Sequence, residues 1–133
     1  MKELFKWYDK YSVNNEEIDN QHKALFSIFN KLYEYRLSNG ANTTLEPIIA
    51  ELVSYTEYHF SAEEEFMRSI GYKDIKKHTA EHEIFTGKIL QLQSNNRLNE
   101  HVTPKELIVY LWNWITNHVL VEDKKIAFYR KKI

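Results

Sequence analysis

The chain has no cysteine, three glycines and two prolines among its 133 residues, and it lacks a long apolar run. Without cysteine it can form neither disulfides nor thiolate metal ligands. No stretch approaches the roughly 20 apolar residues that a membrane-spanning helix needs. Residues 1–7 include the acidic Glu3 and lack the apolar segment of a signal peptide. We therefore expect a cytoplasmic location and no membrane partner.

The chain also has no marked excess of either positive or negative charge. The chain has 18 Lys and Arg against 19 Asp and Glu, which gives a formal net charge of −1, and the basic residues are scattered. This distribution argues against a nucleic-acid-binding surface and favours small partners. The length lies in the range of one domain of roughly 100 to 150 residues, so we expect residues 1–133 to form a single domain.

Long periodic segments between the few glycines and prolines predict an all-α protein. Four helices are expected, from about Glu16 to Ser38 before Asn39-Gly40, from Thr43 to Ser69 before Gly71, from after Asp74 to Ser94-Asn95-Asn96, and from the capping box Thr103-Pro104-Lys105-Glu106 to about Arg130. Because the connections are short, neighbouring helices should be antiparallel. The predicted fold is an up-down-up-down four-helix bundle with an N-terminal arm.

Each predicted helix carries a histidine within its own apolar stripe, the set of positions that recur every three or four residues. The stripes are Ile18, His22, Leu25, Phe29 and Leu32; then Leu45, Ile49, Leu52, Thr56, His59 and Glu63; then Ile75, His78, His82, Phe85, Ile89 and Leu92; and finally Leu107, Leu111, Trp114, His118 and Val121. A buried imidazole or carboxylate without a partner costs roughly several kcal/mol. Because all four stripes carry such a group, its burial calls for an interaction that offsets this cost.

Metal binding supplies that interaction. If the helices alternate in direction, the five stripe histidines and Glu63 converge at one end of the bundle. Taken singly, the motifs are weak: the pair His78-x3-His82 is often a surface coincidence, and a lone core histidine is usually structural. Glu64 and Glu65, next to Glu63, look like a solvated acidic face. The sixth histidine, His101, lies off every stripe and is left out of the site.

Asp123 does not fit the pattern. It follows His118 by five residues, which in a regular α-helix turns it about 140° away. Periodicity alone therefore predicts a surface residue. If Asp123 is a ligand, either its side chain reaches round the helix or the helix is locally widened by a π-type turn, a feature that is frequent at functional sites.

The sequence resembles the hemerythrin family, and most closely its bacterial members. The resemblance covers nearly the whole chain and rests on Trp7 and Val13, Ile18-Asp19-x-Gln21-His22, His59-Phe60-x-x-Glu63-Glu64-x-x-Met67 with Gly71-Tyr72, His78-x3-His82-x-x-Phe85, and Trp114-x3-His118-x4-Asp123. Together these motifs are far more specific than any one of them alone.

The resemblance implies a non-haem di-iron centre that binds dioxygen. One iron would be held by His78, His82 and His118 and the other by His22 and His59, with Glu63, Asp123 and an oxo or hydroxo ligand bridging the two. It favours Asp123 as a ligand, against the periodicity argument. It also implies an oxygen pocket formed by Leu25, Phe60, Trp114 and Val121, although these four residues could equally be ordinary core.

The expected function is reversible binding of dioxygen, for transport, storage or delivery, without enzymatic turnover. A histidine-rich ligand set lacks the excess anionic charge with which carboxylate-dominated di-iron oxidases support high-valent iron. Three alternatives use the same site: a di-iron sensor, an iron-storage or detoxification protein, and a peroxidase or nitric-oxide-handling enzyme. Zinc is the chemical alternative, although seven ligands exceed what one tetrahedral zinc ion uses. The oligomeric state stays open, with a monomer as one option.

Overall fold

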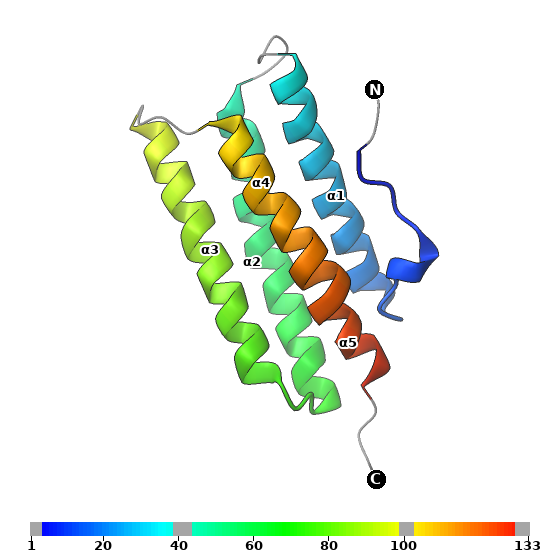
Figure 1. Ribbon diagram of the computed structural model, residues 1–133. Coiled ribbons are helices and arrows are strands. Elements are labelled where there is room, and N and C mark those ends of the chain that lie inside the picture. Colours follow the sequence, from blue (N-terminus) through cyan, green and yellow to red (C-terminus); the bar gives the residue numbers. More distant parts are fainter. Residues whose placement is uncertain (1–3, 39–43, 99–102, 130–133) are drawn as a thin grey trace.

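Four helical rods make up the structure, a computed structural model that describes residues 4–38, 44–98 and 103–129 (Figure 1). A short 3-10 turn, Asp9–Tyr11, precedes α1 (Glu16–Leu37), α2 (Leu45–Ile70) and α3 (Ile75–Arg97). The fourth rod is continuous but changes its winding, from α4 (Pro104–Trp114) through a π-helical segment η2 (Ile115–Glu122) to α5 (Asp123–Phe128). The described residues contain no strand. The predicted all-α class is confirmed.

Local signals at the helix ends account for most of these boundaries. The Asn15 side chain accepts a hydrogen bond from the Ile18 amide at the start of α1, and Thr103 Oγ1 accepts one from the Glu106 amide at the start of α4. Gly71 ends α2 with a φ of 64°, a left-handed conformation that favours glycine. Four predicted boundary residues and the sixth histidine lie outside the described residues: Asn39, Gly40, Thr43, Arg130 and His101.

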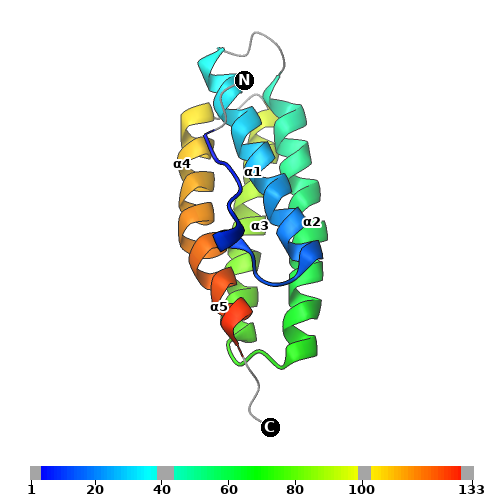
Figure 2. The same ribbon diagram turned by 90° about the vertical axis from the view of Figure 1, so that its right-hand side faces the viewer.

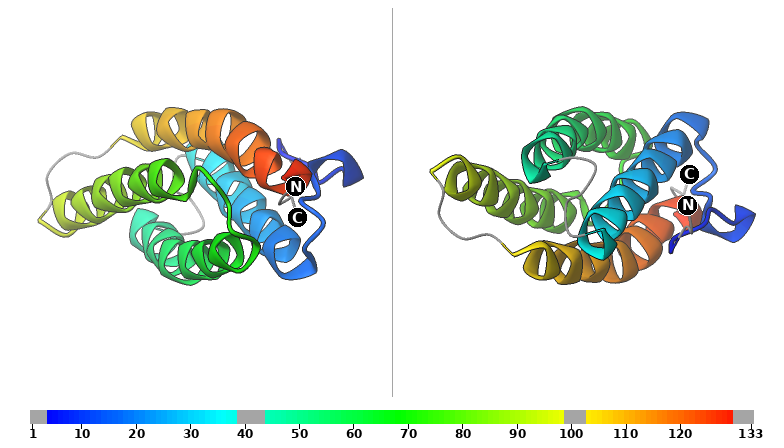
Figure 3. Two further views of the ribbon diagram at one scale, coloured as in Figure 1. Left: turned by 90° about the horizontal axis from the view of Figure 1, so that it is seen from below. Right: turned by 90° about the horizontal axis from the view of Figure 1, so that it is seen from above.

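The rods run alternately up and down, so the start of α1, the end of α2, the start of α3 and the end of the fourth rod share one end of the bundle (Figure 1). Viewed along their length, α1 to α4 surround a common core, with the last rod packed beside the first (Figure 3). The predicted up-down-up-down bundle is therefore confirmed. No helix in the described part of the chain is long and apolar enough to cross a membrane.

The N-terminal arm runs along the outside of the bundle, over α1 and the fourth rod (Figure 2). The Phe5 ring lies 5.0 Å from the Phe29 ring on α1 and 4.8 Å from Trp112 on α4. The Asn30 side chain fixes the arm's backbone, because it accepts hydrogen bonds from the Leu4 and Phe5 amides and donates one to the Phe5 carbonyl.

Apolar packing is divided into zones along the bundle. One large cluster, which includes Leu25, Leu32 and Phe85, fills most of the interior. Two small clusters that contain residues of α5, one around Ala127 and one around Ile126, close the end where the alternating helices bring the histidines together. The histidines are therefore held in a polar layer with apolar packing on both sides.

Candidate metal centre

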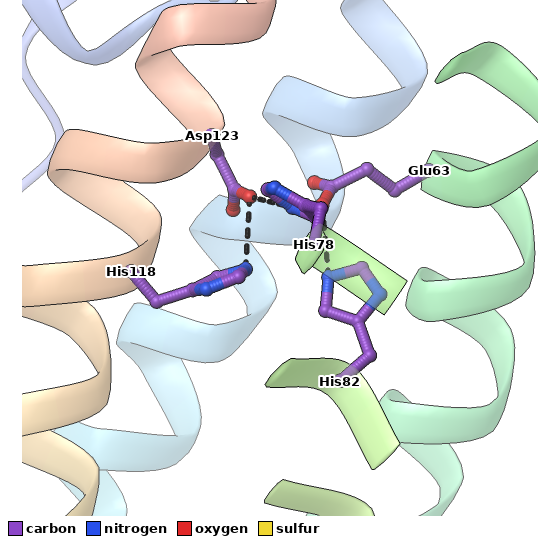
Figure 4. Close-up of side chains that lie close together, drawn as sticks. All are labelled: Glu63, His78, His82, His118 and Asp123. Atoms are coloured by element: carbon purple, nitrogen blue, oxygen red, sulfur yellow. Dashed lines mark hydrogen bonds and ion pairs between the residues drawn. The ribbon is translucent and has the colours of Figure 1, made fainter. Parts of the chain in front are cut away.

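Seven polar side chains gather at one level of the bundle, the five stripe histidines and Glu63 as predicted, together with Asp123. Each is buried, with 1–4% of its surface exposed: His22 from α1, His59 and Glu63 from α2, His78 and His82 from α3, His118 from η2 and Asp123 from α5. Five of them are drawn in Figure 4, where both carboxylates and three imidazoles from three rods point toward one another. Helical spacing therefore predicted six of these seven side chains correctly, whereas Asp123 was expected here only from the family resemblance.

A π-helical turn brings Asp123 into the layer. The Asp123 amide donates its hydrogen bond to the carbonyl of His118, five residues earlier, as in a π-helix. This wider turn returns the fifth residue to the same face of the rod. Asp123 is 1% exposed, so the surface position that regular periodicity predicts is wrong, and the alternative of a widened helix is confirmed.

The same turn corrects the placement of Val121. An α-helical period puts Val121 on the inward stripe three residues after His118, but its side chain is 47% exposed. Because η2 spans residues 115–122, positions after His118 are rotated relative to an α-helix, and Val121 faces outward. Val121 therefore does not line the interior beside the histidines.

All five histidines turn the same ring nitrogen, Nε2, toward the two carboxylates. Glu63 lies 2.7 Å from His78, 3.1 Å from His82 and 3.3 Å from His59. Asp123 lies 2.8 Å from His78 and 3.1 Å from both His22 and His118. Each carboxylate thus faces imidazoles from several helices.

These contacts divide into two overlapping sets of metal-ligand type. One set comprises Glu63, His78, His82, His118 and Asp123, and the other comprises His22, His59, Glu63 and Asp123. Within each set the donor atoms lie within 4.8 Å of one another. Opposite ligands around one ion with bonds of about 2.1 Å would be about 4 Å apart. The arrangement thus matches two neighbouring ions that share both carboxylates.

Unsatisfied polar atoms support the same interpretation. Nε2 of His22, His82 and His118, one oxygen of Glu63 and both oxygens of Asp123 are buried and have no hydrogen-bond partner among the described residues. Buried polar atoms in folded proteins almost always have a partner. Imidazole nitrogens and carboxylate oxygens are the donor set that suits iron and related divalent metals. The residues therefore fit a pair of metal ions.

Electrostatics in the metal-free protein point the same way. Burial lowers the pKa of His22 and His78, but the adjacent carboxylates of Asp123 and Glu63 outweigh it and raise the pKa to about 9 for His22 and about 10 for His78. Burial raises the pKa of Glu63 and Asp123, yet the surrounding histidines hold both below their usual values. Burial lowers the pKa of His59. Protons on His22 and His78 thus balance the two carboxylates where metal ions would otherwise do so.

Aromatic rings cover three of the imidazoles. Phe60 stacks on His82, with centroids 3.9 Å apart. Trp114 stacks on His118 at 3.9 Å, and Tyr55 on His59 at 5.0 Å. The Tyr55 hydroxyl is buried without a hydrogen-bond partner among the described residues, and burial, followed by the charges of Asp123 and Glu63, raises its pKa. The surroundings of the polar layer are therefore apolar and aromatic.

Outer partners of the histidines were missed by sequence reasoning. Gln21 Oε1 lies 2.6 Å from Nδ1 of His59, Glu64 lies 2.9 Å from Nδ1 of His82, and Glu81 lies 3.1 Å from Nδ1 of His118. Interpreting Glu64 as part of a solvated acidic face was wrong, because its side chain is only 23% exposed and contacts a buried histidine. The available signal was position, since Gln21, Glu64 and Glu81 each directly adjoin a residue of the seven in the sequence.

Comparison with known proteins gives consistent matches. A family profile described as "Hemerythrin HHE cation binding domain" matches residues 13–127. A bacteriohemerythrin from Clostridium acetobutylicum is 32% identical over 126 residues, covering 92% of this chain and 98% of that protein. One from Campylobacter jejuni is 33% identical over 118 residues, covering 89% of each. A crystal structure of wild-type hemerythrin superposes with a TM-score of 0.83 at 28% identity, covering 93% of this chain and 95% of that one.

Proposed function

This chain belongs to the hemerythrin family, and from that premise we propose that its buried polar layer holds two iron ions and binds dioxygen reversibly. One ion would be held by His78, His82 and His118, and the other by His22 and His59. Glu63 and Asp123 would bridge the two ions, together with an oxo or hydroxo ligand. The observation that carries the proposal is the sharing of both carboxylates between two donor sets.

The unequal donor sets support binding at one ion. The set with three histidines offers one more protein ligand than the set with two, so a small molecule has room on the ion of His22 and His59. When bound, the iron pair would supply the electrons that dioxygen takes up on binding and returns on release. The side chains of the layer hold the ions, orient them and keep water out.

Apolar neighbours suit reversible binding better than oxidation chemistry. Leu25 and Phe60 are buried beside the layer, and Trp114 is packed against His118. We propose these three as the wall of the oxygen pocket, without Val121. A dry, largely apolar wall would exclude water, and the protons that water carries, from the site. The Tyr55 hydroxyl, whose ring stacks on His59, has a raised pKa and so holds its proton.

Metal analysis combined with visible spectroscopy tests the proposal. We expect two irons per chain and an absorption band that appears when air is admitted to the reduced protein and disappears when oxygen is removed. His118→Ala should lose this behaviour. His101→Ala is the matched control, because it removes the histidine that the sequence places off every stripe. Zinc in place of iron, a colourless iron-loaded protein, or steady turnover with a reducing substrate would refute reversible oxygen binding.

A further inference from the structure

The outer ring nitrogens of the histidines meet different partners on the two sides of the layer. All five imidazoles direct Nε2 inward, so Nδ1 faces away from the carboxylates that would bridge the metals. When Nε2 binds a metal, Nδ1 carries a proton and donates a hydrogen bond. The acceptor that each Nδ1 finds is therefore a separate property of this sequence.

On the side of three histidines the acceptors are charged. Glu64 accepts from His82 at 2.9 Å, and Glu81 accepts from His118 at 3.1 Å. Both carboxylates reach the protein surface, with 23% of the Glu64 side chain and 34% of the Glu81 side chain exposed.

On the side of two histidines no charged acceptor is present among the described residues. His59 Nδ1 is 2.6 Å from the amide oxygen of Gln21, a neutral group. His22 Nδ1 is buried and has no hydrogen-bond partner in the described part of the chain. The difference in charge between the two sides is thus two outer carboxylates against none.

We propose that Glu64 and Glu81 are positioning residues that give the three-histidine ion the lower reduction potential of the pair. A carboxylate that accepts the Nδ1 proton makes the imidazole a stronger electron donor, and a stronger donor stabilises the more highly charged metal. Gln21 gives His59 an orientation without this added donation. The inference rests on the proposed function, because it assumes that the layer holds two redox-active ions.

The difference in donor strength between the two sides affects where a small molecule would bind. The ion of His22 and His59 keeps weaker donors and therefore stays reduced at potentials where its neighbour is already oxidised. It is also the ion with fewer protein ligands. Glu64, Glu81 and Gln21 would thus keep one ion reduced, namely the ion that has room for a small molecule. Glu63 and Asp123 would link it to a neighbouring ion that gives up its electron more easily.

Isosteric variants separate charge from orientation. Glu64→Gln and Glu81→Gln each keep an oxygen that can accept from the imidazole but remove the negative charge. Gln21→Glu adds a charge on the other side. Changing a hydrogen-bond partner of a metal ligand alters metal affinity or activity by about tenfold or more. For a one-electron step, a tenfold change in an equilibrium constant corresponds to about 59 mV.

Spectroelectrochemical titration of the iron-loaded protein under argon is the test. We expect two one-electron steps. Glu64→Gln and Glu81→Gln should each raise the lower potential by about 59 mV, and Gln21→Glu should reduce the higher potential by a similar amount. Glu65→Gln and Glu83→Gln are matched controls, because each removes an exposed carboxylate one or two residues away, and both should leave the two potentials near the parent values.

Three results would overturn the inference: equal shifts in the controls, no change of the lower potential in Glu64→Gln and Glu81→Gln, or one two-electron step in the parent. If a variant resists iron loading, titration of its metal-free form with Co2+ provides a second measurement. One of the two Co2+ sites should then weaken by about tenfold, and unchanged affinity counts against the inference. A parent chain that fails to bind two irons would refute the proposed function itself, whereas two irons with insensitive potentials would refute only the role of Glu64 and Glu81.

Discussion

Leu25 and Leu32 form a matched pair that tests whether the apolar wall protects the metal centre. Both lie on the inner face of α1, seven residues apart, and both are 0% exposed. At about 1.5 Å per residue, Leu25 is about 4.5 Å along the helix axis from His22, whereas Leu32 is about 15 Å from it. The two leucines therefore differ in their distance from the centre and little else.

Replacing either leucine by alanine should destabilise the fold to a similar degree. Buried Leu→Ala changes cost roughly 2.7–5.0 kcal/mol, which for a chain of this length lowers the melting temperature by on the order of 10 °C. The spaces left behind differ in chemistry. Water enters a cavity only where polar partners are available. Both leucines belong to the large apolar cluster, but the space at Leu25 lies about one helical turn from His22 and can be wetted from the polar layer, whereas the space at Leu32 lies about three turns away among apolar side chains.

Autoxidation distinguishes the two variants. Each is loaded with iron under argon, exposed to air, and followed by the decay of the oxygenated absorption band. We expect Leu25→Ala to decay about tenfold faster than the parent, in line with the effects of changed surroundings on metal sites, and Leu32→Ala to decay at nearly the parent rate. Equal rates in the two variants, whether slow or fast, would refute the protective role of Leu25.

Four further predictions concern buried groups in the layer. Tyr55→Phe should raise the free energy of unfolding of the metal-free protein by about 1 kcal/mol in urea titrations, because the buried hydroxyl has no partner among the described residues; lower stability would contradict this. At pH 7, anaerobic loading with Fe2+ in weak buffer should release at least the protons of His22 and His78, whose pKa values are raised to about 9 and about 10. Since these pKa values exceed the ordinary 6.5, the two protons stabilise the metal-free fold fully below pH 6.5. The melting temperature of the metal-free protein should therefore fall as the pH rises from 6.5 through 9 to 10. A melting temperature that does not change with pH would contradict the assignment. Asp123→Ala should bind fewer than two irons per chain by elemental analysis, whereas Asp74→Asn, an exposed control, should keep the parent stoichiometry.

Local periodicity explains why most of the layer could be predicted. His22, His59, Glu63, His78 and His82 each lie in a regular α-helix, and spacing by three and four residues fixes the inward face of such a helix. Helix direction then follows from short connections, so the height of each residue in the bundle also follows. These properties belong to single segments of the chain and need no knowledge of the neighbouring helix.

The outer partners could not be predicted in this way. Whether Glu64 reaches His82, or Glu81 reaches His118, depends on the rotation and height of one helix relative to another. Glu64 and Glu65 are alike in the sequence, yet only Glu64 turns toward α3 while Glu65 is exposed. Such contacts between side chains of different helices arise from packing, which the spacing within one helix does not encode.

The fourth rod shows a conflict between spacing and packing that the π-helical segment resolves. Leu107 and Leu111 before it, and Ile115 and His118 in its first half, recur every three or four residues and are buried; after it, Asp123, Ile126 and Ala127 are buried as well. Between His118 and Asp123 the interval is five, one residue more than an α-helical turn accommodates. A regular helix could bury either the stripe before this point or the one after it, but not both. The segment η2 absorbs the extra residue, so that one rod keeps its apolar stripe on both sides and still turns His118 and Asp123 toward the same histidines.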